Sequence, residues 1–334
     1  MRSFDYSFLE NEMLPAGFVN IVSEISVLQE RMDNRRDSLG DVLERLEPIA
    51  KERSVRASSE IAGGSDDRFG SYHEALSLVH DESDHPAFKE YIQEDDILRL
   101  HGILFSDSAR FAGRYKETND KIETRLQGNY LFQFSPISVE ETPLAVNQLI
   151  HAYMEAKENP NINNLLLIPC FAFDFLCIYP FMKGNGRMSR LLSLLLLYKN
   201  GFDVGRYISF EDKICFSKGE YFAAIRKSSD DWHENNNSYF PFMAYFLNTL
   251  LLCYKELDGY KGQTRHRDGD NREVPKNQQI KDFVLSCLIP ISKQEICNTL
   301  SANSTTVEKT LGLMVKETLI KKVGSGRNTK YIKV

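Results

Sequence analysis

The sequence lacks the features typical of secreted, zinc-binding and membrane-spanning proteins. Its six cysteines include no C-x-x-C pair and its seven histidines no H-x-x-x-H pair, so we expect neither a disulfide framework nor a metal site. The first residues contain no apolar segment of the kind that directs secretion. The longest apolar stretches are interrupted before any could cross a bilayer, by Pro169, Asp174, Pro180 and Lys199. The sequence therefore predicts a cytoplasmic protein with no membrane partner.

The composition is that of an ordinary folded protein with an uneven distribution of charge. The 334 residues are 42% hydrophobic and 26% charged, with a net charge of −6, which is enough material for one main core and a smaller second one. From Lys276 to the end the sequence has ten Lys+Arg and four Asp+Glu, a net of +6. The preceding residues therefore carry −12. A basic segment after an acidic body indicates two domains with different partners.

Hydrophobic periodicity predicts a mainly α-helical body. Residues 15–56 have the pattern of two helices, the first an amphipathic one over FVNIVSEISVLQERM and the second, DVLERLEPIAKERSV, interrupted by Pro48. Residues 162–200 predict two core helices joined by a polar turn and ended by Asn200-Gly201. The exception is 109–136, where turn residues beside β-forming residues predict a hairpin.

The last part of the chain has a different predicted order of elements, with three short helices followed by a strand, a glycine-containing turn and a strand. This is the layout of a winged helix-turn-helix, so we expect nucleic acid as one potential partner, and a protein–protein module of the same shape stays open. Glu308 and Glu317 on the third helix count against nucleic acid. The basic residues available for phosphates are Lys309, Lys316, Lys321, Lys322, Arg327 and Lys330. The expected divisions are an N-terminal helical region at 1–110, a core at 111–257, a linker at 258–278 and the winged helix at 279–334.

The most unusual stretch is YPFMKGNGRMSR, residues 179–190, which places polar residues between two apolar runs. Its two glycines let backbone N–H groups point outward together, and the helix that follows presents its positive end to the same place. Two arginines three positions apart share one face of that helix. The stretch therefore predicts a polyphosphate site. The alternative is an ordinary helix start whose two arginines lie on the surface and bind no ligand. The candidate anion-binding residues are Gly184, Asn185, Gly186, Arg187 and Arg190.

The same stretch resembles the signature of the Fic (Fido) family, H-P-F-x-[D/E]-G-N-G-R-x-x-R. Seven positions match, namely Pro180, Phe181, Gly184, Asn185, Gly186, Arg187 and Arg190, and the flanking residues from roughly 45 to 260 are also similar. The resemblance implies a helical fold that transfers AMP from ATP to a hydroxyl of a target protein. It also implies that Tyr221 and residues 237–242 form the adenine pocket. The hairpin at 113–128 would dock the target by strand pairing.

Two positions with chemical roles differ from the family pattern. The base histidine is Tyr179, and a phenol with an ordinary pKa near 10 is a poor base at neutral pH. Losing a positioned general base typically costs about 10²–10⁴-fold in rate. The acidic Mg²⁺ ligand is Lys183, so Mg²⁺ has no carboxylate at this position and a lysine ammonium would neutralise phosphate instead. Asn185, the third residue of the expected catalytic set, is the same as in the family signature.

A third difference concerns the family's inhibitory helix, [S/T]-x-x-x-E-[G/N], whose glutamate pairs with the second motif arginine. The matching residues lie in 57–64 and are Ser58, Ala62 and Gly63, with Ala62 in place of the glutamate. We therefore expect Arg190 to be unpaired and free for an anion. Asp174, a lone acid in an apolar helix, is expected to pair with a motif arginine or to cap a backbone group.

Together these differences predict a Fic-type protein that binds ATP or a related nucleotide and is impaired for AMP transfer. One alternative is an active transferase or hydrolase in which the pKa of Tyr179 is lowered enough for it to act as base or nucleophile. Another is a nucleotide-sensing regulator that acts through the winged helix. The sequence leaves open the target protein, the formation of homo-oligomers, and whether Tyr179, Lys183 and Ala62 are natural or engineered residues.

Overall fold

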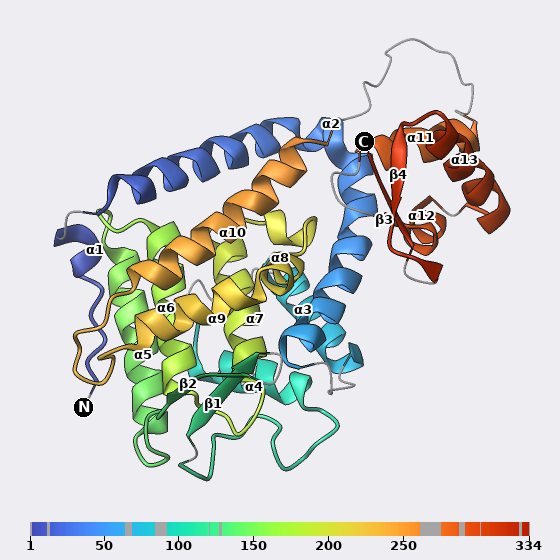
Figure 1. The fold of residues 1–334 in the computed structure, drawn as a ribbon. Helices are drawn as coiled ribbons and strands as arrows, with labels where there is room; N and C mark the ends of the chain where they lie inside the picture. Colours follow the sequence, from blue (N-terminus) through green and yellow to red (C-terminus); the bar gives the residue numbers. More distant parts are fainter. Residues whose placement is uncertain are drawn as a thin grey trace.

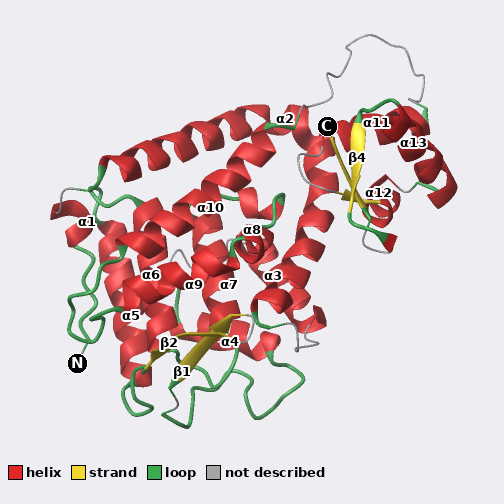
Figure 2. Ribbon diagram, in the orientation of Figure 1, coloured by secondary structure: helices red, strands yellow, loops and turns green. Residues whose placement is uncertain are grey.

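The computed structural model is mainly helical, as the sequence predicts, with two small antiparallel sheets (Figures 1 and 2). No helix in the described part of the chain is long and apolar enough to cross a membrane. The structure describes residues 2–11, 14–63, 69–83, 92–119, 121–126, 129–260, 275–286, 291–300, 302–326 and 329–333.

A single 46-residue helix, α2 (Ala16–Ile61), runs along the top of the body and then turns down its right side in Figure 1. The prediction of two helices, the second interrupted by Pro48, is wrong. A proline inside a helix removes one backbone hydrogen bond and costs about 3 kcal/mol, but here Leu46, Ile49 and Ala50 beside it are all buried. Packing of α2 against neighbouring helices on both sides of the proline outweighs this cost.

The centre of the body is the helix pair α6 (Asn164–Ile178) and α7 (Asn185–Lys199), which confirms the two core helices predicted over 162–200. Nearly every residue of α6 is buried, which explains why its sequence is apolar on all sides. Gly201 has a φ of 83° and follows the last turn of α7. The other helices of the body are α1 (Phe8–Asn11), α3 (Phe69–Ser83), α4 (Glu94–Leu104), α5 (Thr142–Glu158), η1 (Val204–Arg206), α8 (Phe210–Phe216), α9 (Lys218–Ser229) and α10 (Phe240–Asp258).

One continuous hydrophobic core extends from Tyr6 to Tyr260 and takes in both the expected N-terminal region and the expected 111–257 core. Within it, α2 packs along α10 and α8. The strands β1 (Ile122–Leu126) and β2 (Asn129–Phe134) pair antiparallel where the hairpin was expected. Gly128, at the end of the expected docking segment, lies outside the described residues.

A second, smaller core belongs to the C-terminal module, residues 276–333. Its first helix begins at Lys276, inside the stretch expected as a linker, and most of that stretch, 261–274, lies outside the described residues. Ile49 of α2 joins this core, so the long helix contacts both parts of the protein. The elements are α11 (Lys276–Ser286), β3 (Ile291–Ser292), α12 (Lys293–Leu300), α13 (Ser304–Lys316), β4 (Ile320–Val323) and β5 (Lys330–Lys333), with sheet order β3-β5-β4.

Candidate functional site

A cavity of about 480 Å³ lies between the end of α2, the hairpin, the 179–190 stretch and α9; we call it the motif cavity. The structure brings together around it the expected residues of the 179–190 stretch, Tyr221, Ala62 and Gly63, whereas Ser58 and residues 237–242 do not line it. The hairpin contributes residues that the sequence did not indicate as site residues. The lining residues used below are Ala62, Glu123, Phe134, Leu176, Cys177, Tyr179, Lys183, Gly184, Asn185, Gly186, Arg187, Arg190, Lys218, Tyr221, Phe222 and Ile225.

The turn between α6 and α7 is closed by the side chain of Asn185. Its Oδ1 accepts a hydrogen bond from the Phe181 backbone N–H at 2.9 Å, and its Nδ2 donates to the Phe181 carbonyl at 2.7 Å. The preceding helix ends at Tyr179, whose φ of 52° and ψ of 62° place it in the left-handed region. Asn185 is buried by these contacts, so its main role is to shape the turn that presents the start of α7 to the cavity.

The two glycines of the turn serve different purposes. Gly184 has a φ of 82°, and a Cβ added there would lie only 2.4 Å from Cε2 of Phe105. A Cβ on Gly186 would have Nη1 of Arg190, at 3.5 Å, as its nearest neighbour, which is an ordinary contact. The fold therefore requires glycine at 184, whereas glycine at 186 keeps open space beside the arginine.

Both motif arginines are buried at the cavity wall, with Arg187 5% and Arg190 4% exposed. The expectation that Arg190 is unpaired is wrong, because its Nη2 donates to Oγ of Ser58 at 3.1 Å and its side chain also hydrogen-bonds Tyr221. Ser58 lies one turn before Ala62 on the same face of α2, so its hydroxyl reaches inward. A hydroxyl carries no charge, and the guanidinium therefore keeps its attraction for an anion.

A buried carboxylate that the sequence did not single out lies close enough to Arg190 for their charges to interact. Glu211, at the start of α8, accepts a hydrogen bond from the Tyr72 hydroxyl at 2.7 Å, and its charge acts on Arg190. Both side chains are buried. A buried guanidinium is stable only with opposite charge and hydrogen bonds nearby. This carboxylate does not line the cavity, and within the described part of the chain no acid pairs with Arg190 inside the cavity.

His101 on α4 is a second residue that the sequence did not single out. The Gly113 backbone N–H donates to its Nδ1 at 3.1 Å, so the proton lies on Nε2, which donates to the Lys183 carbonyl at 3.1 Å. The ring also stacks on Phe181 with 3.7 Å between ring centroids. A lone histidine among the buried apolar residues of amphipathic α4 is the one sequence signal for this contact, which holds the turn in place.

Burial lowers the pKa of His101 to about 4, below the ordinary value of 6.5. Between these values the unfolded chain takes up a proton that the folded protein does not, so the free energy of unfolding falls as the pH falls from 6.5 to 4. We expect His101 to contribute roughly 3 kcal/mol of this loss. Urea unfolding at several pH values should show a shallower loss for His101→Gln than for the unaltered protein. His151→Gln, at a side chain 83% exposed, is the control and should follow the unaltered protein; parallel curves for all three would contradict the assignment.

The structure does not favour a chemically activated Tyr179. Burial raises the pKa of the Tyr179 phenol, the direction opposite to that which a base or nucleophile at this position needs. Lys183 is exposed at the rim, and its ammonium lies 5.1 Å from the centroid of the Phe111 ring. Tyr221 lines the cavity as expected, whereas residues 237–242 do not, because they surround a separate buried network described below.

The comparisons with known proteins agree with this geometry. Residues 91–197 match the family model described as the Fic/DOC family. A Fido domain-containing protein of Dictyostelium discoideum is 27% identical over 156 residues, which are 47% of this chain and 94% of that protein. Among solved structures, a Fic family protein of Desulfovibrio desulfuricans has a TM-score of 0.57 at 18% identity, covering 96% of this chain and 97% of its own.

Two further structures extend the likeness. A Fic domain containing signaling protein of Bacteroides thetaiotaomicron has a TM-score of 0.55 at 17% identity, covering 69% of this chain and 95% of its own. Fic-1 of C. elegans, in a form with one glutamate replaced by glycine, has a TM-score of 0.54 at 18% identity, covering 73% of this chain and 72% of its own. At these identities the structures show a shared fold. The family match covers residues 91–197, so this part of the chain is a Fic/DOC domain, and members of this family typically transfer AMP or similar groups.

Proposed function

We propose that this protein binds ATP or a related nucleoside polyphosphate in the motif cavity and is impaired for AMP transfer. The observation that carries the proposal is the charge of the wall. Two buried arginines and two lysines line the cavity, and Glu123 is its one lining carboxylate among the described residues. Burial strengthens the attraction between guanidinium and phosphate. The start of α7 adds its positive dipole at the same place.

Part of the cavity wall suits a nucleobase. It consists of apolar and aromatic side chains from three elements, namely Phe134, Leu176, Cys177, Tyr221, Phe222 and Ile225. A volume of about 480 Å³ is within the range of small-molecule sites. The proposal therefore places the base against α6 and α9 and the phosphates at the turn.

Transfer is impaired because the described residues of the cavity include no suitable base, and position 183 has no carboxylate. The phenol of Tyr179 stays protonated at neutral pH, and an ammonium at Lys183 neutralises phosphate without fixing the α-phosphate as octahedral Mg²⁺ does. Mg²⁺ is accordingly not required for binding in this proposal. Docking of a target protein on the 113–128 hairpin is part of the proposal as well.

Replacing Arg187 by Ala tests the phosphate contact. We expect ATP affinity measured by calorimetry to fall roughly 10–100-fold, because a charge-assisted contact of about 1.5–3 kcal/mol is lost. Arg226→Ala is the matched control, because Arg226 lies exposed on α9 and does not line the cavity. Equal affinity in both variants, with unchanged circular dichroism, would remove the arginine from the site.

Replacing Ala62 by Glu tests the site against the family's mode of inhibition. Ala62 lines the cavity near Arg190, so a carboxylate there should compete with the terminal phosphate of ATP. We expect ATP binding to weaken about 10-fold, equivalent to roughly 1.4 kcal/mol, and AMP binding to change little. Ala62→Gln is the uncharged control. A loss that is the same for AMP and ATP would point to general damage to the cavity.

A second candidate function is nucleic-acid binding by the C-terminal module, if it is a winged helix. The two acids on α13 and just after it that count against it are both paired, Glu317 with Lys281 at 3.2 Å and Glu308 with Lys293 at 3.1 Å. Lys309, Lys316, Lys321, Lys322 and Lys330 are left for phosphates, while Arg327 lies outside the described residues. If duplex DNA binds, Lys321→Glu/Lys322→Glu should reduce the slope of affinity against salt by about 2. Absence of DNA binding would favour a protein partner.

A further inference from the structure

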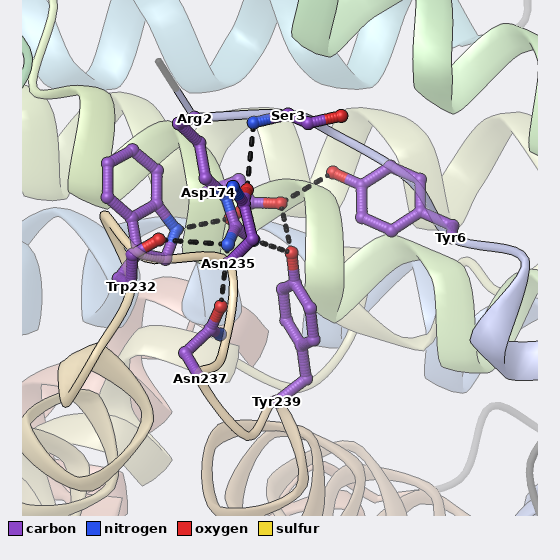
Figure 3. A network of polar contacts seen from close by, with 8 residues as sticks. All are labelled: Arg2, Ser3, Tyr6, Asp174, Trp232, Asn235, Asn237 and Tyr239. Atoms are coloured by element: carbon purple, nitrogen blue, oxygen red, sulfur yellow. Dashed lines mark hydrogen bonds and ion pairs between the residues drawn. The ribbon is translucent and has the colours of Figure 1, made fainter.

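Asp174 on α6 is fully buried, and four side chains converge on it (Figure 3). Hydroxyl groups of Tyr6 and Tyr239 each donate to its Oδ2 at 2.8 Å, and Nε1 of Trp232 donates to its Oδ1 at 2.6 Å. Its cationic partner is Arg2, at 3.5 Å. The sequence expectation of a motif arginine or a backbone cap is therefore wrong, because the partner lies 172 residues away in the sequence.

The surroundings of Arg2 have the shape and chemistry of a guanidinium receptor. Its Nη1 donates to the Trp232 carbonyl at 2.9 Å and to Oδ1 of Asn237 at 2.8 Å, while Nη2 contacts Asp174 and the hydroxyl of Tyr239. The guanidinium carbon lies 5.0 Å from the centroid of the Trp232 ring. Its Nε has no hydrogen-bond partner among the described residues. A carboxylate, oxygen acceptors in the guanidinium plane and an aromatic face are what this planar cation requires.

This group, which we call the Asp174 cage (Asp174, Trp232, Asn237 and Tyr239), is packed directly against the wall of the motif cavity. The ring of Phe134 on β2 lies edge-on to Trp232 at 5.9 Å and stacks on His233 at 5.5 Å. His233 Nε2 donates to the Ser135 carbonyl at 2.7 Å. Because Phe134 also lines the motif cavity, a shift of Trp232 would move that wall.

We propose that the Asp174 cage is a guanidinium-binding site filled by Arg2, and that its filling holds Trp232 and β2 where they wall the motif cavity. The second part of the proposal rests on the proposed nucleotide binding; the first part does not. A lysine would fill the cage poorly, because one ammonium cannot reach the carboxylate and the acceptors on the opposite side together. A separate cavity of about 490 Å³, lined partly by Arg2, Asn237 and Tyr239, borders the cage. It offers a small cation a way in once the Arg2 side chain is removed.

Chemical rescue of Arg2→Ala in the full chain tests the cage. Trp232 is the protein's one tryptophan, so its fluorescence reports on this site alone. We expect Arg2→Ala to shift the emission to the red and to lower the Tm by roughly 5–10 °C, because Asp174 is left buried without its cation. Methylguanidinium at millimolar concentration, far below denaturing levels, should reverse both changes in a saturable way. Ammonium and sodium chloride at equal concentration should not.

Two further variants keep this test decisive. Arg31→Ala removes a surface arginine that is 50% exposed and paired with Asp258, and it should show no response to methylguanidinium. Arg2→Lys keeps the charge and most of the chain volume, and its emission should also be red-shifted if Arg2→Ala proves too unstable to study. Unchanged emission in Arg2→Lys, or recovery of Arg2→Ala with any monovalent salt, would overturn the cage.

The coupling to the motif cavity has its own readout. We expect Arg2→Ala to bind ATP about 10-fold more weakly than the unaltered protein, with methylguanidinium restoring the affinity, and 10-fold equals roughly 1.4 kcal/mol. If methylguanidinium restores the fluorescence of Arg2→Ala but its ATP affinity equals that of the unaltered protein, the proposed coupling is wrong and the guanidinium site stands. Absence of ATP binding in the unaltered protein would contradict both the coupling and the proposed function. The fluorescence experiment would still show whether the Asp174 cage binds a guanidinium group.

Discussion

The Tyr179→His/Lys183→Asp variant is expected to transfer AMP about 10²–10⁴-fold faster than the unaltered protein, because it restores a general base and a carboxylate for Mg²⁺. Both positions tolerate the change. Tyr179 has a φ of 52°, and histidine adopts this left-handed region more readily than most residues. Lys183 is exposed at the cavity rim. Self-modification with ATP labelled at the α-phosphate measures the rate.

The single variants and a phosphate-site variant are the controls for this experiment. Each single change should recover less than the double change, since base and metal act on the same step. Adding Arg187→Ala to the double variant should abolish the gain. Equal rates in the double variant and the unaltered protein would mean that the missing groups do not limit transfer. A measurable rate in the unaltered protein that Tyr179→Phe abolishes would instead identify Tyr179 as a working base.

Gly184→Ala is expected to lower the free energy of unfolding by about 2–5 kcal/mol. The left-handed backbone at 184 costs an alanine roughly 1–2 kcal/mol, and its Cβ would overlap the Phe105 ring at 2.4 Å, which adds an overpacking cost of about 1–3 kcal/mol. Urea unfolding of the purified variant measures the loss. A loss below about 1 kcal/mol would mean that the turn does not have the described geometry.

Gly186→Ala is the matched change two residues along, and we expect it to leave stability intact while it weakens ATP binding. Its Cβ meets no atom closer than 3.5 Å, and alanine favours a helix over glycine by up to about 1 kcal/mol. Stability should therefore be equal or slightly higher, while ATP affinity falls about 10-fold because the new methyl group lies beside Arg190. Unchanged ATP affinity would place the phosphates elsewhere in the cavity.

The parts of the site that the sequence predicts are those determined within a short stretch of chain. The turn from Tyr179 to Arg190 follows from a glycine at a position of positive φ, from an asparagine that bonds its own turn, and from the apolar runs on either side. The end of α7 at Asn200-Gly201 is likewise local. These features need no knowledge of the rest of the fold.

The parts that the sequence did not predict depend on contacts between distant segments. Arg190 appeared free because Ser58, its partner, lies 132 residues away. The Asp174 partner Arg2 and the supporting His101 were missed for the same reason. The break expected at Pro48 failed because packing along α2 outweighs the local cost of a proline. Local propensity cannot report any of these pairings.

Calorimetric titration of the unaltered protein with ATP, once with Mg²⁺ and once with EDTA, tests the central claim most directly. The proposed function predicts saturable binding in EDTA, with an affinity that Mg²⁺ changes by less than about 10-fold, and no labelled AMP on the protein afterwards. Binding that requires Mg²⁺, self-modification by the unaltered protein, or no binding under either condition would contradict it.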